Sequence, residues 1–124
     1  MKKVLIIEDD EVIRIYAEKT LSEGGYEVAT AEDGKQGYEK AVAIMPELIV
    51  LDLMMPVMHG FDTCQALRRD HRFDKTKIVI TSGKRYPVDK KAAIRLGADG
   101  YLEKPYSARQ LLTIAAHLLE LPKP

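Results

Sequence analysis

Five polar side chains of this sequence could together perform chemistry, and they follow four separate apolar runs. They are the carboxylates of Glu8, Asp9 and Asp52, the hydroxyl of Thr81 and the ammonium of Lys104. Three carboxylates brought together repel one another and raise each other's pKa, so such a group persists where a cation offsets it. Carboxylate oxygens suit a hard divalent cation, and a shallow site that keeps several waters suits Mg²⁺. With an ammonium and a hydroxyl beside it, such a site would bind a phosphoryl group.

The sequence lacks the glycine patterns that bind nucleotide phosphates. Neither the Gly24-Gly25 pair nor the Gly97–Gly100 segment has the G-x-x-x-x-G-K-[ST] or G-x-G-x-x-G spacing. The phosphoryl group is therefore expected on the protein itself, with Asp52 as the nucleophile. Taken alone, Asp52 could equally be a loop carboxylate that caps the next helix, so the surrounding elements have to decide.

The elements that must position these side chains alternate along the chain. Apolar runs predict strands at residues 4–7, 26–31, 48–51, 78–80 and 99–102. Between and after these runs, apolar residues at helical spacing predict five helices. The alternation indicates an α/β fold, a doubly wound five-stranded parallel sheet with five helices. Because parallel strands end at the same edge of the sheet, the five polar side chains are expected to converge there.

Local signals predict how several elements begin and end. Asp10 is expected to cap the first helix, Pro87 to lie in the first turn of the fourth, and Ser107 with Gln110 to form a capping box at the last. Residues 71–77 are expected to form a polar loop. The first helix is expected to carry an apolar side made by Val12, Ile13, Tyr16, Thr20 and Leu21.

Composition limits the classes of function. The 124 residues are expected to form one domain over residues 1–121, with residues 122–124 as a tail or the start of a linker. Nineteen basic and nineteen acidic residues give a formal net charge of zero, so direct nucleic-acid binding by this domain is not expected. The single cysteine, Cys64, excludes an internal disulfide and is expected to pack inside the fold. No signal peptide or membrane-spanning stretch is recognisable, so the cytoplasm is the expected location.

Four segments together, IIEDDE, LDLMMPVMHG, IVITSG and GADGYLEKPY, resemble the response regulator receiver domain of two-component signalling, the CheY-like superfamily. The resemblance covers nearly the whole chain. It implies a flavodoxin-like (CheY-like) topology and a signalling role in a phosphorelay. It also implies that the chain is not an enzyme, beyond phosphorylating and dephosphorylating itself.

The resemblance assigns a role to each residue of the acidic group. Asp52 matches the phosphoacceptor, which takes its phosphoryl group from a sensor histidine kinase or a histidine phosphotransfer protein. Glu8 and Asp9 match the acid pair that holds Mg²⁺ together with Asp52 and the backbone carbonyl of Met54. His59, in the loop after Asp52, is expected to be solvated rather than to act as a phosphate carrier or ligand.

The resemblance also implies how phosphorylation would be read. Lys104 and Thr81 match the residues that bond the phosphoryl oxygens, and Tyr101 matches an aromatic switch that moves inward with Thr81. The Lys104-Pro105 bond matches a cis peptide that aims Lys104 into the site. An output partner or a second receiver is expected to bind the face that runs from Pro87 to Leu119.

Other functions remain open at this stage. The chain could be the receiver part of a larger regulator with a DNA-binding or enzymatic output domain. A Mg²⁺-dependent phosphoaspartate phosphatase of the haloacid dehalogenase type is a remote alternative, because such enzymes carry a second Asp where Met54 stands. A flavodoxin-like cofactor binder is disfavoured by the acidic end of the sheet and the missing phosphate loop.

Overall fold

Five parallel strands form one sheet at the centre of the molecule. A computed structural model describes residues 1–55, 59–83 and 90–120, so the expected first-turn position of Pro87 and the tail at residues 122–124 lie outside the described residues. The strands lie in the order β2-β1-β3-β4-β5. Their bounds are β1 Lys3–Ile7, β2 Glu27–Ala31, β3 Leu48–Asp52, β4 Lys77–Ser82 and β5 Gly100–Glu103.

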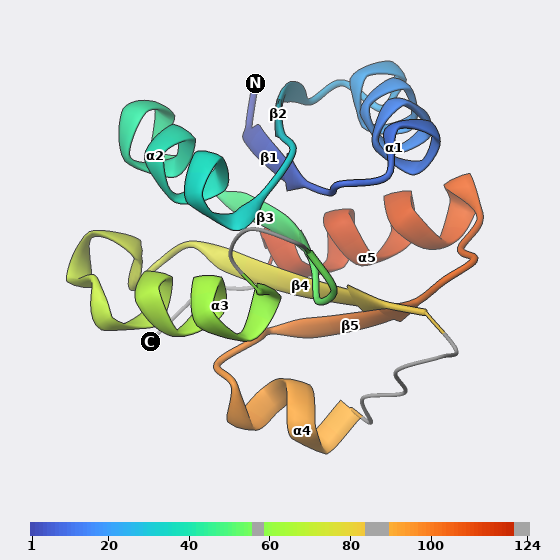
Figure 1. Cartoon of the computed structure of the whole chain (residues 1–124). Coiled ribbons are helices and arrows are strands. Elements are labelled where there is room, and N and C mark those ends of the chain that lie inside the picture. Colours follow the sequence, from blue (N-terminus) through green and yellow to red (C-terminus); the bar gives the residue numbers. More distant parts are fainter. Residues whose placement is uncertain (56–58, 84–89, 121–124) are drawn as a thin grey trace.

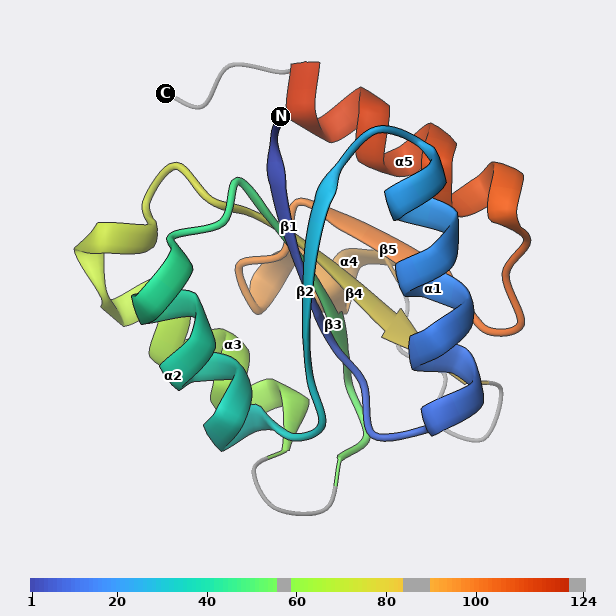
Figure 2. The ribbon, with the colours of Figure 1, turned by 90° about the horizontal axis from the view of Figure 1, so that it is seen from above.

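Helices cover both faces of this sheet, as Figures 1 and 2 show. They are α1 Glu11–Glu23, α2 Gly34–Ile44, α3 Gly60–Arg69, α4 Lys90–Arg95 and α5 Ala108–Glu120. In Figure 2, α1 and α5 lie on one side of the sheet, and α2 and α3 lie on the other. The strand order and the two helical layers confirm the predicted doubly wound, flavodoxin-like fold.

The two faces of the sheet bury two separate sets of side chains, because successive strand residues point to opposite faces. Leu5, Ile49 and Ile78 belong to the cluster that also includes Ala41 of α2 and Leu67 of α3. The adjacent strand residues Val4, Leu48 and Val79 belong to the second cluster, which also includes residues of α1 and α5. All five residues of β3 are buried, as expected for a central strand covered on both faces.

Helix α1 begins as predicted and buries Thr20 and Leu21 of the predicted apolar side, but not Val12 or Tyr16. Asp10 caps it by accepting a hydrogen bond from the Ile13 amide at 3.0 Å. Its buried residues are Ala17, Thr20 and Leu21, whereas Val12 is 77% exposed and Tyr16 is 44% exposed. At about 100° per residue, Tyr16 lies roughly 100° from Ala17, on the flank of the helix, and Val12 lies roughly 140° from Ala17 and 180° from Leu21, on the side that faces away from the core. The expectation that Val12 and Tyr16 lie on the buried side is therefore wrong.

The segment expected to be a polar loop contains a short 3₁₀ helix, η1 His71–Phe73, with Phe73 fully buried. Arg68 of α3 holds this segment by donating hydrogen bonds to the carbonyls of Phe73 and Thr76, each at 2.8 Å. The same guanidinium contacts the Gly97 carbonyl at 2.8 Å and Asp99 Oδ2 at 2.9 Å. A single apolar residue in a polar run has no periodicity, so the sequence pattern could not indicate its burial.

Ser107 and Gln110 form the predicted capping box at α5: each backbone amide donates to the other residue's side-chain oxygen, at 2.8 and 3.1 Å. Among the residues that the structure describes, no helix combines the length and the apolar character needed to cross a bilayer.

Candidate functional site

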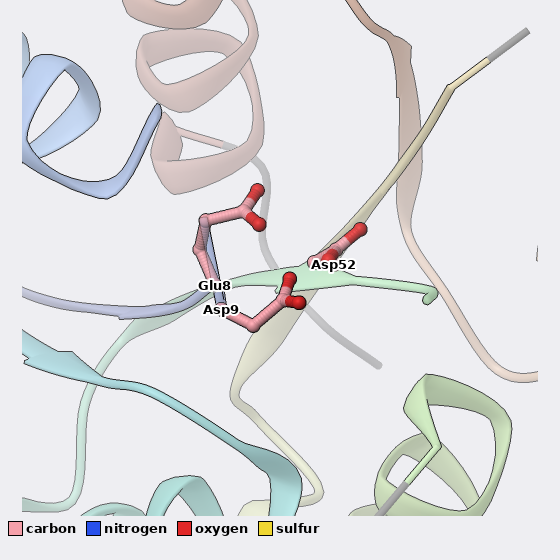
Figure 3. Close-up of side chains that lie close together, drawn as sticks. All are labelled: Glu8, Asp9 and Asp52. Carbon is pink, nitrogen blue, oxygen red and sulfur yellow. The ribbon is translucent and has the colours of Figure 1, made fainter. Parts of the chain in front are cut away.

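Three carboxylates meet at the edge of the sheet where β1 and β3 end. Glu8 and Asp9 directly follow β1, and Asp52 is the last residue of β3. Figure 3 shows the Glu8 and Asp9 side chains leaving the end of β1 beside Asp52. One oxygen from each lies within 4.8 Å of the others, an arrangement that could hold a metal ion. Glu8 and Asp52 are each 3% exposed, whereas Asp9 is exposed and leaves the group open to solvent.

Lys104 brings one positive charge into this group. It follows β5, and its peptide bond to Pro105 is cis. The Lys104 ammonium lies 2.6 Å from Glu8 Oε1 and 3.0 Å from Asp52 Oδ1, so it joins the ends of β1 and β3 from the far side of β4. One ammonium is thus shared between two buried carboxylates.

The pKa values show that this ammonium does not offset the acids fully. Burial and the negative charge of Asp52 raise the pKa of Glu8 to about 8, although the ion pair with Lys104 lowers it. Burial also raises the pKa of Asp52 above its ordinary value against the opposing effect of Lys104. A cation bound between the carboxylates would favour their ionised forms. The oxygen-only donor set fits a hard divalent ion such as Mg²⁺.

Arg14 positions the acidic segment and was missed by the sequence analysis. Its Nη1 donates to the carbonyls of Glu8 and Asp9, at 3.0 and 3.3 Å, and its Nη2 lies 3.5 Å from Glu32. These contacts orient the segment between β1 and α1 so that its side chains face the site. The sequence did contain one signal for this role. A cation near the N-terminus of a helix is not stabilised by the helix dipole, so the position of Arg14 indicates that its side chain has another partner.

Thr81 and Tyr101 lie on neighbouring strands beside the acidic group. Thr81 is buried in β4 and pairs in register with Asp52, while the Leu53 amide donates to the Thr81 carbonyl at 2.9 Å. Tyr101 of β5 is half-buried, and its hydroxyl interacts with Ser82. Burial and the charge of Glu103 raise the pKa of Tyr101. Thr81 and Tyr101, the two residues predicted to act as a switch, therefore lie on adjacent strands, with Thr81 on the strand next to β3.

Met54 and His59 pack together at the rim of the site. The Met54 amide donates to Asp52 Oδ1 at 3.3 Å, and its sulfur lies 3.3 Å from His59 Nε2. His59 caps α3 through Nδ1, which accepts from the Phe61 amide at 3.2 Å, and its ring stacks on Phe61. His59 is half-buried and therefore only partly solvated, and the expectation that it is neither a phosphate carrier nor a ligand stays a prediction.

A cavity of about 480 Å³ lies beside the acidic group, with Lys104 as a shared wall. Its lining is largely apolar and comes from α1 and from the segment after β5: Val12, Ile13, Tyr16, Lys104, Pro105 and Tyr106. Burial and the negative charges of Glu8 and Asp52 raise the pKa of Tyr106 well above its ordinary value, which places its hydroxyl within the field of the carboxylates. The helical spacing of Val12, Ile13 and Tyr16 gives no indication of this cavity, because it predicts an apolar side but not what that side contacts.

Known proteins are similar to this chain in both sequence and fold. The family described as "Response regulator receiver domain" matches residues 4–116. The transcriptional regulator RpaA of Synechocystis is 39% identical over 119 residues, which cover 96% of this chain and 49% of RpaA. The regulatory protein PhoP of Bacillus subtilis is 37% identical over 110 residues, 89% of this chain and 45% of PhoP.

Solved structures give the same result. The chemotaxis protein CheY4 of Vibrio cholerae superposes with a TM-score of 0.88 at 35% identity, covering 95% of this chain and 98% of CheY4. The chain thus spans about half the length of the curated relatives RpaA and PhoP, and nearly all of CheY4. On the match across residues 4–116, this chain belongs to the response regulator receiver domain family.

Proposed function

We propose that Asp52 accepts a phosphoryl group from a phosphohistidine on a sensor kinase or a histidine phosphotransfer protein. The observation that carries this proposal is the position of the Asp52 carboxylate, at the end of the central strand and 3.0 Å from the Lys104 ammonium. A nucleophile in this position has a fixed cation beside it to meet the incoming phosphoryl oxygens. The family match supports the same assignment.

The residues around Asp52 divide the chemistry between them. A carboxylate oxygen of Asp52 forms the new bond to phosphorus as the bond to the donor nitrogen breaks, and that electron pair leaves with the imidazole. Lys104 and Thr81 would bond the phosphoryl oxygens. Glu8, Asp9 and Asp52, with the backbone carbonyl of Met54, would hold Mg²⁺, which offsets negative charge on the carboxylates and the phosphoryl group.

The surface beside the site supports a protein donor. Three large apolar side chains of α1 are more than 40% exposed: Val12 at 77%, Ile15 at 53% and Tyr16 at 44%. Exposed apolar residues gathered next to a reactive group favour contact with a partner rather than with water. A donor domain that covers them would bring its phosphohistidine to Asp52.

Phosphorylation would be read on the face from Pro87 to Leu119, of which the structure describes residues 90–119. Thr81 lies beside Asp52, and Tyr101 lies on the next strand, so a group that draws Thr81 inward can bias the position of Tyr101. Lys91 and Arg95 make α4 basic, which suits an acidic output partner or a second receiver. Because RpaA and PhoP are about twice as long as this chain, the alternative of a larger regulator with its own output domain is retained.

Phosphotransfer to an Asp52→Asn variant tests the proposal. A labelled, phosphorylated kinase should label the wild type and leave Asp52→Asn unlabelled. Asp74→Asn is the matched control, because Asp74 is exposed and precedes β4, at the opposite end of the strands from the site. Label on Asp52→Asn at the wild-type rate would contradict the assignment. Continuous release of phosphate from varied esters would instead favour the phosphatase alternative.

A further inference from the structure

Arg14 connects the acidic segment that follows β1 to two other parts of the fold. Its side chain is 14% exposed, and Nη1 donates hydrogen bonds to the backbone carbonyls of Glu8 and Asp9, at 3.0 and 3.3 Å. On the other side of the guanidinium, Nη2 lies 3.5 Å from Oε1 of Glu32, which lies between β2 and α2. One side chain thus ties the connection after β1 to helix α1 and to the connection after β2.

The charge of Arg14 does not explain this position. A guanidinium stays positively charged across the ordinary pH range, and this one contacts two of the residues that the proposed function assigns to Mg²⁺. Its charge repels a divalent cation bound there. Glu32 is 66% exposed, so water screens its charge and the ion pair offsets this repulsion only in part. Any benefit of Arg14 to the metal site must therefore come from geometry.

The hydrogen bonds from Arg14 fix the backbone that carries two of the carboxylates. The Glu8 amide donates to the Ala31 carbonyl at 3.1 Å while the Glu8 carbonyl accepts from Arg14, so this residue is held on both sides of its Cα atom. Asp9 is exposed, and the bond from Arg14 to its carbonyl limits the movement of its backbone. These bonds therefore set the direction in which the two side chains leave the end of β1 (Figure 3).

We propose that Arg14 is a positioning residue that makes the acidic site selective for Mg²⁺ over Ca²⁺. This inference rests on the proposed role of Glu8, Asp9 and Asp52 as Mg²⁺ ligands. Mg²⁺ requires near-ideal octahedral geometry with oxygens at about 2.0–2.1 Å, whereas Ca²⁺ accepts longer and less regular distances. Carboxylates on a tethered backbone meet the stricter requirement, while carboxylates on a loose segment would still bind Ca²⁺. Arg14 thus favours the smaller ion although its charge repels both.

Two substitutions of Arg14 separate geometry from charge. Arg14→Lys keeps the charge but replaces two nitrogens in a rigid plane with one flexible, strongly hydrated nitrogen, which cannot reach the carbonyls and Glu32 together. Arg14→Gln removes the charge as well. Isothermal titration calorimetry of the unphosphorylated protein measures the dissociation constants of Mg²⁺ and of Ca²⁺. In Arg14→Lys the Mg²⁺ affinity should fall about tenfold, as when a group that orients metal ligands is lost, and the Ca²⁺ affinity should fall less.

The ratio of the Ca²⁺ to the Mg²⁺ dissociation constant should therefore fall in both variants, and other effects of the substitutions leave this ratio unchanged. Losing a positive charge alters the affinity for both ions by nearly the same factor, because the two ions carry equal charge. A partly unfolded variant would also lose affinity for both ions by one factor, and urea unfolding with a chelator measures the folded fraction. Lys19→Gln is the control, because it removes a charge from an exposed position further along α1, and its ratio should equal that of the wild type.

The outcomes separate this inference from the proposed function. If the wild type binds Mg²⁺ and the ratio in Arg14→Lys equals the wild-type ratio, the role of Arg14 is overturned and the metal site stands. The same conclusion follows if Arg14→Gln binds both ions more tightly at an unchanged ratio, because Arg14 would then act only through its charge. A wild type that binds neither ion would overturn both this inference and the proposed Mg²⁺ site.

Discussion

Replacing Glu8 with Gln should remove a pH dependence from the stability of the metal-free protein. Glu8 is 3% exposed, and burial beside Asp52 raises its pKa to about 8 despite the ion pair with Lys104. In the unfolded chain the same carboxyl should titrate near its ordinary value of 4.5. The folded state therefore binds this proton more tightly than the unfolded state does.

The sign and the size of the effect follow from this difference. The stability that protonation provides is fully present below pH 4.5 and is lost as the pH rises through about 8. Each pKa unit corresponds to about 1.4 kcal/mol, so the gap sets an upper limit of about 5 kcal/mol on the loss. Because a buried site relaxes and admits water when a charge forms in it, we expect the wild type to lose only about 1 to 3 kcal/mol relative to Glu8→Gln between pH 5 and pH 9.

Urea unfolding in the presence of a chelator, at one-unit steps from pH 5 to pH 9, measures the difference in unfolding free energy between wild type and variant. Glu39→Gln, which removes an exposed carboxylate from α2, is the control and should follow the wild type. Saturating Mg²⁺ should reduce the wild-type dependence, because a bound cation favours ionised Glu8. A difference between wild type and Glu8→Gln that stays constant within about 0.5 kcal/mol would refute the reasoning.

Three further predictions concern the metal, the switch and the far edge of the sheet. Without metal, Asp9→Asn should be at least as stable as the wild type. Mg²⁺ at ten times its dissociation constant should stabilise the wild type by about 1.4 kcal/mol, and the variant should lose most of this increase. A rise in Tm with Mg²⁺ that is unchanged in the variant would contradict this prediction. Thr81→Ala should remain phosphorylatable but show smaller amide shifts over residues 90–119 with beryllofluoride than the wild type, and equal shifts would disprove the coupling. Arg68→Lys should lower the unfolding free energy by about 1 to 3 kcal/mol, because lysine cannot make all four hydrogen bonds of the guanidinium. Urea unfolding at neutral pH checks this, and a stability equal to that of the wild type would show that the contacts contribute little.

Much of the fold could be predicted because its signals are periodic. Buried parallel strands read as continuous apolar runs, and the alternation with helices determines the sheet. The convergence of Glu8, Asp52 and Lys104 follows from that topology, since parallel strands present their ends at one edge. Their convergence could therefore be predicted without any information on how the elements pack.

The features that sequence could not predict depend on packing between elements. Phe73 is buried where Arg68 donates a hydrogen bond to its carbonyl and the Tyr38 ring contacts its ring edge to face. Neither contact is indicated by a sequence pattern. Val12 and Tyr16 fit a helical spacing, yet the rotation of α1 about its axis is set by how Ala17 and Leu21 meet the second core cluster. The same rotation leaves Val12 and Tyr16 in the lining of the cavity beside Lys104.

The position of Asp52 has a consequence for dynamics. It belongs to β3, the central strand, which pairs with β1 on one side and β4 on the other and is buried along its whole length. Backbone at such a place opens only with the global unfolding of the domain, so its amides should exchange with solvent more slowly than those of the helices. The backbone around a covalent group added there would be too rigid to change conformation. The conformational change would therefore take place in side chains and in the segments beyond the strand ends. The stiffest part of the molecule would thus turn a local chemical event into movement elsewhere.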